Sequence, residues 1–236
     1  MRAEYITHSG SDLTVVNAAR VSFDKESDWE WTEQADPESD SRVLVARPSL
    51  STRDVKLIRY LAAHNHFTPF THCTITLRET VPIFVARQRF KHTVGFSYNE
   101  VSRRYVDDEP TFYIPDVWRK RAENKKQGSS DEPIVILRPR MHGDQTVSDA
   151  YQRLLYHAEE LYKEMIDVGV APEQARMVLP QSMYTSYYVT GSLAAFARAY
   201  KLRTTPDAQK EIRDLAADWD RIISPLYPVS WKELTE

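Results

Sequence analysis

The sequence predicts an α+β fold, a helix-rich single domain over residues 1–236 with a small mixed or antiparallel sheet. Two long segments, 52–65 and 147–168, carry apolar residues at helical spacing. Residues 73–81 alternate apolar and polar side chains, as in a strand with one buried face. No repeat, low-complexity tract or long linker divides the chain, so one domain is expected.

The first half of the chain is expected to hold one helix, one strand and the start of a second helix. Ser51 or Thr52 can cap the helix at 52–65, because a hydroxyl oxygen accepts a hydrogen bond from the first turn. Pro82 follows the strand and is tolerated in the first turn of a helix, so we expect a helix to begin there.

The second half is expected to be mostly helical. Gly169 ends the long helix at 147–168. Pro172 opens a shorter helix, which Pro180 stops. The remaining helices are expected at 190–201 and from Thr205-Pro206 to residue 222.

Two segments are expected to be loops, at about 24–47 and about 119–146. Residues 24–40 hold eight acids and one lysine, which indicates an exposed excursion that Trp29 and Trp31 anchor to the body or to another subunit. The second loop starts with a basic cluster. That cluster could be a nucleic-acid patch, but the acids, glycine and serines that follow favour a mobile loop.

Composition excludes several classes of protein. The formal charge is −3, from 31 basic and 34 acidic residues, which argues against a protein built mainly to grip nucleic acid. No apolar run approaches the ~20 residues of a membrane span, and the first residues lack the apolar stretch of a secretory signal, so we expect a cytoplasmic protein. Cys73, the one cysteine, excludes an internal disulfide framework. The six glycines form no phosphate-binding motif, so any phosphate must be held by cations or helix termini.

Residues 87–105 form the densest group of candidate functional residues. They include His92 and one acid, Glu100, with these five cations: Arg87, Arg89, Lys91, Arg103 and Arg104. Arginine and lysine make charge-assisted hydrogen bonds to phosphate, so the segment suits a phosphorylated small molecule. The alternative is a cationic surface that is balanced by acids elsewhere.

Three histidines, His64, His66 and His72, lie within nine residues. The segment contains no Asp or Glu, and the nearby thiol belongs to Cys73, so we expect no metal site. Imidazoles among aromatic rings suit hydrogen bonding to, or stacking on, a planar ligand. The alternative is that they cap the preceding helix.

The stretch 174–211 adds further cations and glutamines, including Arg176 and Arg203. Arg203 falls between two predicted helices, where an arginine more often binds carbonyl groups at the surface. No G-x-S-x-G motif is present, which argues against a serine hydrolase.

Taken in order, these motifs resemble the flavin-dependent thymidylate synthases. The match runs from HxHFTPFxH through PIFVARQ and KHTVGFSYNEVSRRYV, with FYIP downstream, to ARMVLPQSMYT and LRT…AQ…I, over roughly residues 50–220. The NAARVSF segment near the start also fits. Each piece alone is a weak signal, but the ordered set is highly specific.

The resemblance implies the fold of that family and its activity, the reductive methylation of dUMP to dTMP for dTTP synthesis. It implies FAD as cofactor, with NADPH and 5,10-methylenetetrahydrofolate as co-substrates. It also implies a homotetramer in which each active site is assembled from several subunits. The family uses no enzyme cysteine as nucleophile, which agrees with a structural Cys73. Neither nucleic acid nor membrane is expected as a partner.

Residue roles also follow from the resemblance, position by position. The expected catalytic residues are Arg203, which would polarise or ionise the uracil ring, and His66, which would order the flavin and folate stack. A fixed cation stabilises enolate-like charge in a water-poor site. The expected cofactor contacts are Thr68, Lys91, His92, Thr93, Glu100, Ser192 and Arg198. The expected dUMP contacts are Gln88, Arg89, Phe90, Lys91, Glu100, Val101, Ser102, Arg103, Arg104, Arg176 and Arg203.

The sequence departs from the family at its Arg-His-Arg triplet, which seven residues usually separate from a serine. Here the triplet is Lys91-His92-Thr93, and eight residues precede Ser102. Lys91 keeps the charge but loses the guanidinium fork, and Thr93 loses the charge. Gly95 could accommodate the inserted residue. Two alternatives therefore stay open: a changed product such as a hydroxymethylated pyrimidine nucleotide, and a nucleic-acid-binding module.

Overall fold

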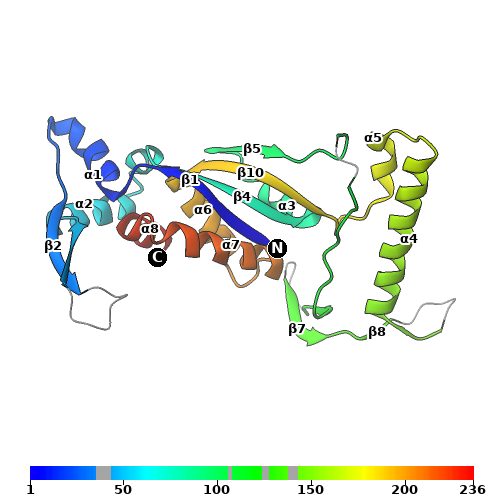
Figure 1. Cartoon of the computed structure of the whole chain (residues 1–236). Helices are drawn as coiled ribbons and strands as arrows, with labels where there is room; N and C mark the ends of the chain where they lie inside the picture. The colour runs from blue at the N-terminus through cyan, green and yellow to red at the C-terminus, as the bar shows by residue number, and fades with distance from the viewer. Residues whose placement is uncertain (36–43, 106–107, 124–127, 138–142) are drawn as a thin grey trace.

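The computed structural model describes residues 1–35, 44–105, 108–123, 128–137 and 143–236. Its centre is a four-stranded antiparallel sheet in the order β1-β4-β10-β5 (Figure 1). The strands span Arg2–Ser9 (β1), Thr74–Pro82 (β4), Tyr184–Ser192 (β10) and Phe96–Glu100 (β5). The fold is α+β, as predicted, and within the described residues every strand pairing is antiparallel.

One face of the sheet is packed by three helices, α3 (Ile83–Arg89), α6 (Leu193–Arg203) and α7 (Lys210–Ile223). The alternation of β4 turns Ile75, Leu77 and Val81 toward these helices, and all three are fully buried. Burying each such side chain contributes about 1.5–3 kcal/mol to stability. The opposite face of β4 carries Thr76 and Arg78 and is covered much less.

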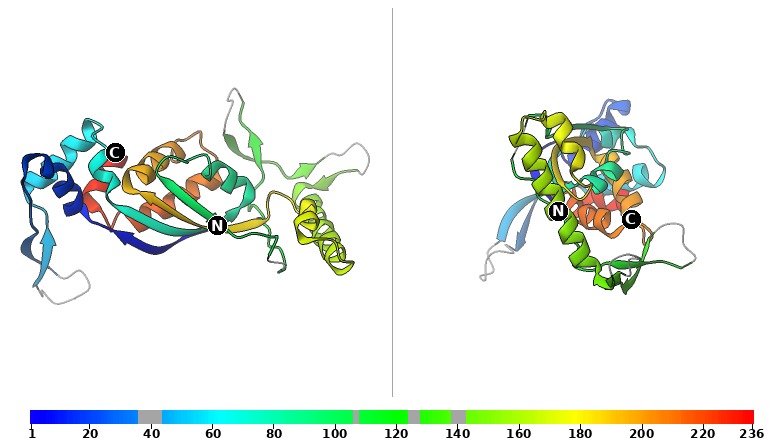
Figure 2. Two further views of the ribbon diagram at one scale, coloured as in Figure 1. Left: turned by 90° about the horizontal axis from the view of Figure 1, so that it is seen from above. Right: turned by 90° about the vertical axis from the view of Figure 1, so that its right-hand side faces the viewer.

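The two ends of the sheet carry separate groups of elements, and Figure 1 and the left view of Figure 2 show an elongated molecule. At one end lie α1 (Asp12–Arg20), η1 (Val21–Phe23), α2 (Thr52–Ala63), η2 (Thr68–Thr71), α8 (Pro228–Thr235) and a hairpin of β2 (Glu30–Ala35) and β3 (Leu44–Ser49). The Asp12 carboxylate accepts hydrogen bonds from Val229 N and Ser230 N, both at 2.9 Å. This contact joins α1 to the first turn of α8.

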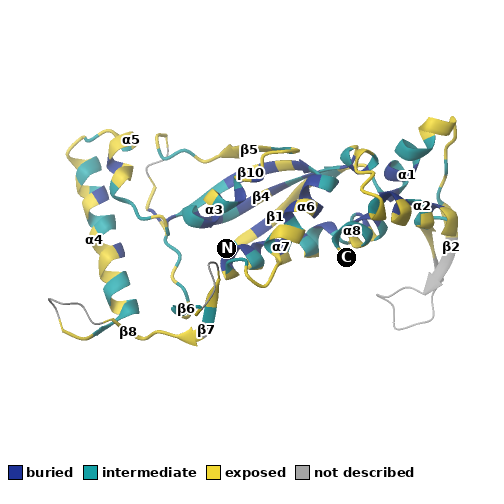
Figure 3. Ribbon diagram, turned by 180° about the vertical axis from the view of Figure 1, so that it is seen from behind, coloured by how far each residue is buried: buried dark blue, intermediate teal, exposed yellow. Residues whose placement is uncertain are grey.

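The other end is built around α4 (Val147–Asp167), α5 (Pro172–Ala175) and η3 (Arg176–Val178). Short strand pairs lead into it, β6 (Arg119–Arg121) with β7 (Ser129–Pro133), and β8 (Ile136–Leu137) with β9 (Gln145–Thr146). On α4, Leu155 and Tyr162 are buried, whereas Leu154 and Leu161 are exposed (Figure 3). The predicted apolar stripe therefore packs over only part of its width within this chain.

Several predicted elements are confirmed. The Ser51 hydroxyl caps α2 by accepting from Asp54 N at 3.1 Å. The predicted strand is β4, although Cys73 lies just before it, and the long helix is α4. None of the described helices is long and apolar enough to cross a lipid bilayer.

Four further predicted helical segments are present, but their bounds differ from those expected. The helix expected at 190–201 begins at Leu193, because 184–192 form β10, and the helix expected at 172–179 is split into α5 and η3. The helix after Pro82 ends at Arg89, and the last predicted helix starts at Lys210 with Gln209 as its N-cap.

The two expected loops contain strands, β2 and β3 in the acidic one and β6 to β9 in the other. Residues 36–43, 124–127 and 138–142 of these loops lie outside the described residues. Trp29 is half-buried, as an anchor would be, but Trp31 is 69% exposed.

Candidate active site

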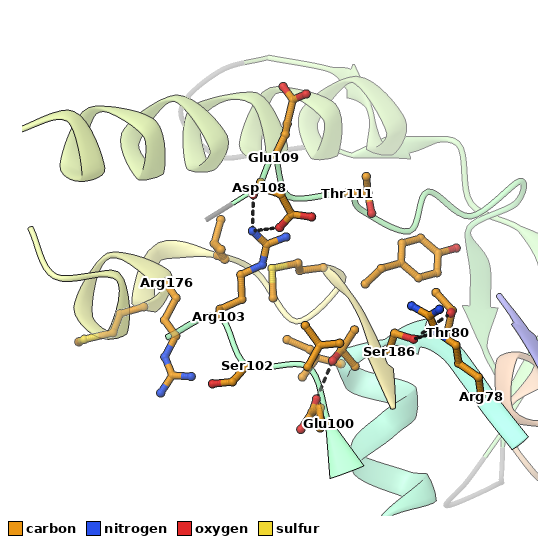
Figure 4. Close-up of a pocket in the computed structure, with 17 residues that line it drawn as sticks. Arg78, Thr80, Glu100, Ser102, Arg103, Asp108, Glu109, Thr111, Arg176 and Ser186 are labelled. Atoms are coloured by element: carbon orange, nitrogen blue, oxygen red, sulfur yellow. Dashed lines mark hydrogen bonds and ion pairs between the residues drawn. The ribbon is translucent and has the colours of Figure 1, made fainter. Parts of the chain in front are cut away.

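A cleft of about 730 Å³ lies where β4, β5 and β10 meet the segment leading to α4 (Figure 4). Its lining includes five of the expected dUMP contacts, namely Glu100, Val101, Ser102, Arg103 and Arg176. The edge strand β5 ends at Glu100, and Val101 N then donates to Ser186 O at 2.9 Å. This bond carries the chain from the sheet edge into the cleft wall.

Charges of both signs line the cleft. Arg103 lies 3.0 Å from Asp108 and turns its guanidinium toward it, while Arg176 points into the opening with its Nε donating to Glu173 O at 3.3 Å. Glu100 accepts a hydrogen bond from the Thr185 hydroxyl at 2.7 Å. The cleft can therefore offer both arginine donors and a fixed carboxylate to a polar ligand.

A second group of expected site residues meets at the C-terminal end of α6. Arg203 Nε donates to His92 Nε2 at 2.8 Å, and Arg203 Nη2 donates to Gln88 O at 3.2 Å. The Gln88 amide donates to the Gln209 side chain just before α7. These residues are not among those that line the cleft, so within one chain the structure separates the two groups.

The imidazole of His92 is buried, with 8% of the residue exposed. Burial, together with the positive charges of Arg203, Arg89 and Arg198, lowers the pKa of His92 to about 4. The ring is therefore neutral near pH 7, which is the form in which Nε2 can accept the hydrogen bond from Arg203.

Arg89 lies in the core and not in the cleft, and its charge acts on His92 from there. Its side chain is fully buried, and its Nε donates to both oxygens of Glu79 at 3.2 and 3.1 Å. Arg89 Nη1 donates to the Tyr98 hydroxyl at 2.7 Å. The expectation that Arg89 contacts the dUMP phosphate conflicts with this position, because the guanidinium is enclosed in the core. Phe90 likewise packs its ring against Tyr98 and Tyr187.

Three of the expected cofactor residues lie on α6 or in elements that contact it. The η2 turn, which starts at Thr68, packs against α6, and Arg198 Nη2 donates to Val94 O at 2.5 Å. Ser192 Oγ caps α6 by accepting from Ala195 N at 3.2 Å. Two further expected cofactor contacts, Lys91 and Thr93, are at the surface, as is His66, an expected catalytic residue.

Several residues in these groups were missed by sequence reasoning. Arg78, Thr185 and Asp108 line the cleft, and Tyr60 stacks on His64 with ring centroids 4.1 Å apart. The period-2 alternation of residues 73–81 could have placed Arg78 on the outer sheet face. Thr185 could not be found once its strand had been missed. Among the described residues, no group of three or more His, Cys, Asp or Glu side chains could hold a metal ion.

Comparison with known proteins connects this geometry to a family. A family model described as "Thymidylate synthase complementing protein" matches residues 4–229. A flavin-dependent thymidylate synthase of Thermosipho africanus is 35% identical over 219 residues, which covers 93% of this chain and 84% of that protein. The chain belongs to the flavin-dependent thymidylate synthase family. A second member, from Thermus thermophilus, is 32% identical over 98% of this chain and 74% of its own length.

A solved structure extends the family assignment to the fold. The UMP/dUMP methylase PolB of Streptomyces cacaoi, bound with 5-Br dUMP, superposes with a TM-score of 0.74 at 29% identity. The superposition covers 99% of this chain and 94% of PolB. Both the central sheet and the helices at its two ends therefore belong to the flavin-dependent thymidylate synthase fold.

Proposed function

We propose that this chain is an enzyme that methylates dUMP at C5 of the pyrimidine ring to give dTMP. In the balanced reaction, 5,10-methylenetetrahydrofolate would supply the carbon and become tetrahydrofolate, and NADPH with one proton would supply the reducing equivalents. Support comes from membership of the family and from the fold shared with PolB, a UMP/dUMP methylase. The observation that carries the proposal is the Arg203 guanidinium, fixed at two of its nitrogens beside Gln88.

Arg203 is suited to act on the pyrimidine. Ionising or polarising the uracil ring places negative charge on its carbonyls and makes C5 nucleophilic, and a cation held in place stabilises that charge without reorganising. Arg203 is half-buried, and desolvation followed by the charge of Arg89 lowers its pKa from the usual value of 12.5. It stays charged at neutral pH, because the pKa of arginine lies so far above 7.

The nucleotide would be held by the cleft. Ser102 and the exposed Arg176 line the cleft and are suited to the phosphate. The exposed Arg104, which follows this wall in the chain, adds a third donor, and Glu100 is suited to accept from a ribose hydroxyl. Because Gln88 and Arg203 lie apart from these residues in one chain, we propose that a complete site combines the two groups from different copies in a homotetramer.

The residues around α6 fit a flavin nucleotide, for which we propose FAD. A flavin needs donors for its ring edge, an apolar or aromatic face and cations for its diphosphate. Exposed Phe67 and His66 offer ring faces beside Thr68, and exposed Lys91 and Arg198 offer the cations. When bound, the flavin supplies the reducing equivalents that convert the transferred carbon to a methyl group.

The test is product formation by the purified protein with FAD, NADPH, 5,10-methylenetetrahydrofolate and dUMP. Mass analysis should give dTMP, and Arg203→Ala should lower turnover far more than flavin content. A hydroxymethylated product would replace the proposed reaction by its alternative, and unchanged dTMP formation by Arg203→Ala would remove that residue from the chemistry. UMP is assayed in parallel because PolB is a methylase of both UMP and dUMP. A colourless protein that binds DNA with steep salt dependence would instead indicate a nucleic-acid-binding module.

A further inference from the structure

The side chain of Arg203 is held by the segment that follows α3. Among the described residues, its guanidinium makes two hydrogen bonds, to His92 Nε2 and to Gln88 O. A guanidinium has five N–H donors, so three remain for a ligand. The bond at Nε fixes the orientation of the guanidinium plane, and the bond at Nη2 fixes one of its two terminal nitrogens.

We propose that His92 is a positioning residue for the reaction, whose neutral imidazole holds the Arg203 guanidinium in its working orientation. This inference rests on the proposed role of Arg203. It gives His92 a task other than the flavin contact that the family resemblance implies.

The exposure of the triplet supports this division of roles. Lys91 and Thr93 are exposed, whereas the His92 ring between them turns inward to Arg203. The two outer residues are therefore placed for a ligand at the surface. The middle residue is placed for a partner inside the same chain.

The loop that carries His92 is held from the core. The His92 carbonyl oxygen accepts from the Tyr98 hydroxyl at 2.7 Å, and His92 N donates to Arg89 O at 3.1 Å. Arg89 in turn donates to the Tyr98 hydroxyl and pairs with Glu79. Because Arg89 and Glu79 are fully buried, the anchor of this loop lies in the packed interior, where displacement is costly.

The other side of the loop is pressed onto α6. Gly95 has φ +78°, and a Cβ at this position would come within 2.9 Å of Ala195 Cβ. Only glycine is accommodated there without strain or displacement. The bond from Arg198 to Val94 O closes the same side. His92 is thus fixed on both sides relative to the helix that ends in Arg203.

The protonation state of His92 decides whether this contact can form. Nε2 accepts only when the ring is neutral and its proton sits on Nδ1. The charged groups that face the ring are Arg203 and Arg198 from α6 and Arg89 from α3, and the Tyr98 hydroxyl contacts its carbonyl. All three cations disfavour a protonated ring, so the acceptor form is present above a pH of about 4 and is lost below it.

The experiment is a double-mutant cycle on the full-length protein. His92→Phe keeps a planar ring without an acceptor and should lower kcat about 10- to 100-fold at saturating FAD, the range for a lost hydrogen bond to a charged group. The same change in an Arg203→Ala background should alter kcat by less than about twofold. His92→Gln retains an acceptor and should recover kcat to within about fivefold of the parent. His157→Phe, on the exposed face of α4, is the matched control.

A second readout does not depend on turnover. In ¹⁵N-histidine NMR of the protein without ligands, the signals lost in His92→Gln should report an Nδ1–H tautomer that stays neutral to about pH 4. In Arg203→Ala the pKa of His92 should rise toward 6.5, because a facing positive charge has been removed. If His92 only filled space in the fold, removing Arg203 would leave the pKa of His92 unchanged.

The outcomes distinguish a positioning role of His92 from a flavin contact. If His92→Phe loses flavin, and its kcat is normal at saturating FAD, His92 is a flavin contact and the inference is wrong. Equal kcat losses in the two backgrounds would also overturn it. If the parent makes no dTMP, or if Arg203→Ala is fully active, the proposed function or the role of Arg203 fails first, and the NMR titration still tests the contact itself.

Discussion

Exchanging Arg89 for methionine should remove much of the stability of this protein, and a second exchange at Glu79 should restore part of it. The Glu79 carboxylate is fully buried and accepts from Arg89 Nε, from the Tyr187 hydroxyl at 2.6 Å and from Trp219 Nε1 at 2.9 Å. In Arg89→Met the last two bonds remain, but the charge has lost its partner.

The magnitude follows from this enclosure. Two unit charges 4 Å apart attract by about 4 kcal/mol at an effective dielectric constant of 20, and leaving one member of a buried pair typically costs 3–5 kcal/mol. The lost cation also stacked on aromatic rings, with its central carbon 4.3 Å from the centroid of Phe96 and 4.6 Å from that of Trp219. We therefore expect Arg89→Met to lower the free energy of unfolding by about 3–5 kcal/mol.

Glu79→Gln should lower the free energy of unfolding in the parent protein but raise it in Arg89→Met. Alone, it leaves the Arg89 cation buried without a counter-charge and should destabilise the protein by at least about 3 kcal/mol. In Arg89→Met it replaces an unpaired carboxylate by a neutral amide. The amide oxygen can still accept from Trp219 Nε1, and the amide NH2 can donate to the Tyr187 hydroxyl oxygen, so the exchange should recover about 2–3 kcal/mol.

Urea denaturation at pH 7 and one fixed protein concentration measures all four proteins. The fixed concentration matters because subunit assembly would contribute to apparent stability. The matched control is Arg59→Met. The Arg59 side chain also donates two hydrogen bonds to a glutamate, Glu233, but it is 62% exposed. The cost of Arg59→Met should be small beside that of Arg89→Met, because water and salt screen an exposed ion pair. Equal destabilisation by Glu79→Gln in both backgrounds would refute the reasoning.

Two further predictions concern the thiol and the assembly of the site. Burial, together with the charge of Asp12, raises the pKa of Cys73 to about 12, so iodoacetamide at pH 8 should label only unfolded protein, and Cys73→Ser should keep most of its activity. An inactive but folded Cys73→Ser would instead indicate a thiol nucleophile. If the cleft and Arg203 come from different copies, Arg176→Ala in the cleft and Arg203→Ala, each with low turnover, should form dTMP faster when refolded together. No gain in turnover would place both groups in one chain.

Local patterns account for the elements that the sequence predicted well. Ser51 three residues before Asp54, and the alternation through Ile75, Leu77 and Val81, each act within a few residues, so they can be read without the rest of the fold. The cleft residues 100–103 were also found together, because they are adjacent in sequence and share one wall.

The strand β10 shows where such reading fails. Every second residue of β10 faces the core, namely Tyr187, Val189 and Gly191. Gly191 has no side chain, so this alternation did not predict a strand. A Cβ at Gly191 would lie 2.4 Å from the Phe96 ring, so the ring of the neighbouring strand occupies that space. The need for glycine is set by a residue 95 positions away along the chain, which no local pattern contains.

Arg89 and His92 show the same limit within the site itself. Both were grouped with the surface cations because charge in a short segment indicates a ligand-binding surface. Glu79 and Trp219, which enclose Arg89, and Arg203, which engages His92, come from other parts of the chain and decide where these side chains point. The cationic segment thus divides into exposed residues that can meet a phosphate and buried residues that hold the loop in place. Counting the charged residues of this segment from the sequence therefore overstates how many side chains a ligand can reach. The division also explains why a lysine and a threonine can flank His92 without disturbing Arg203, because neither side chain makes the contact that orients it.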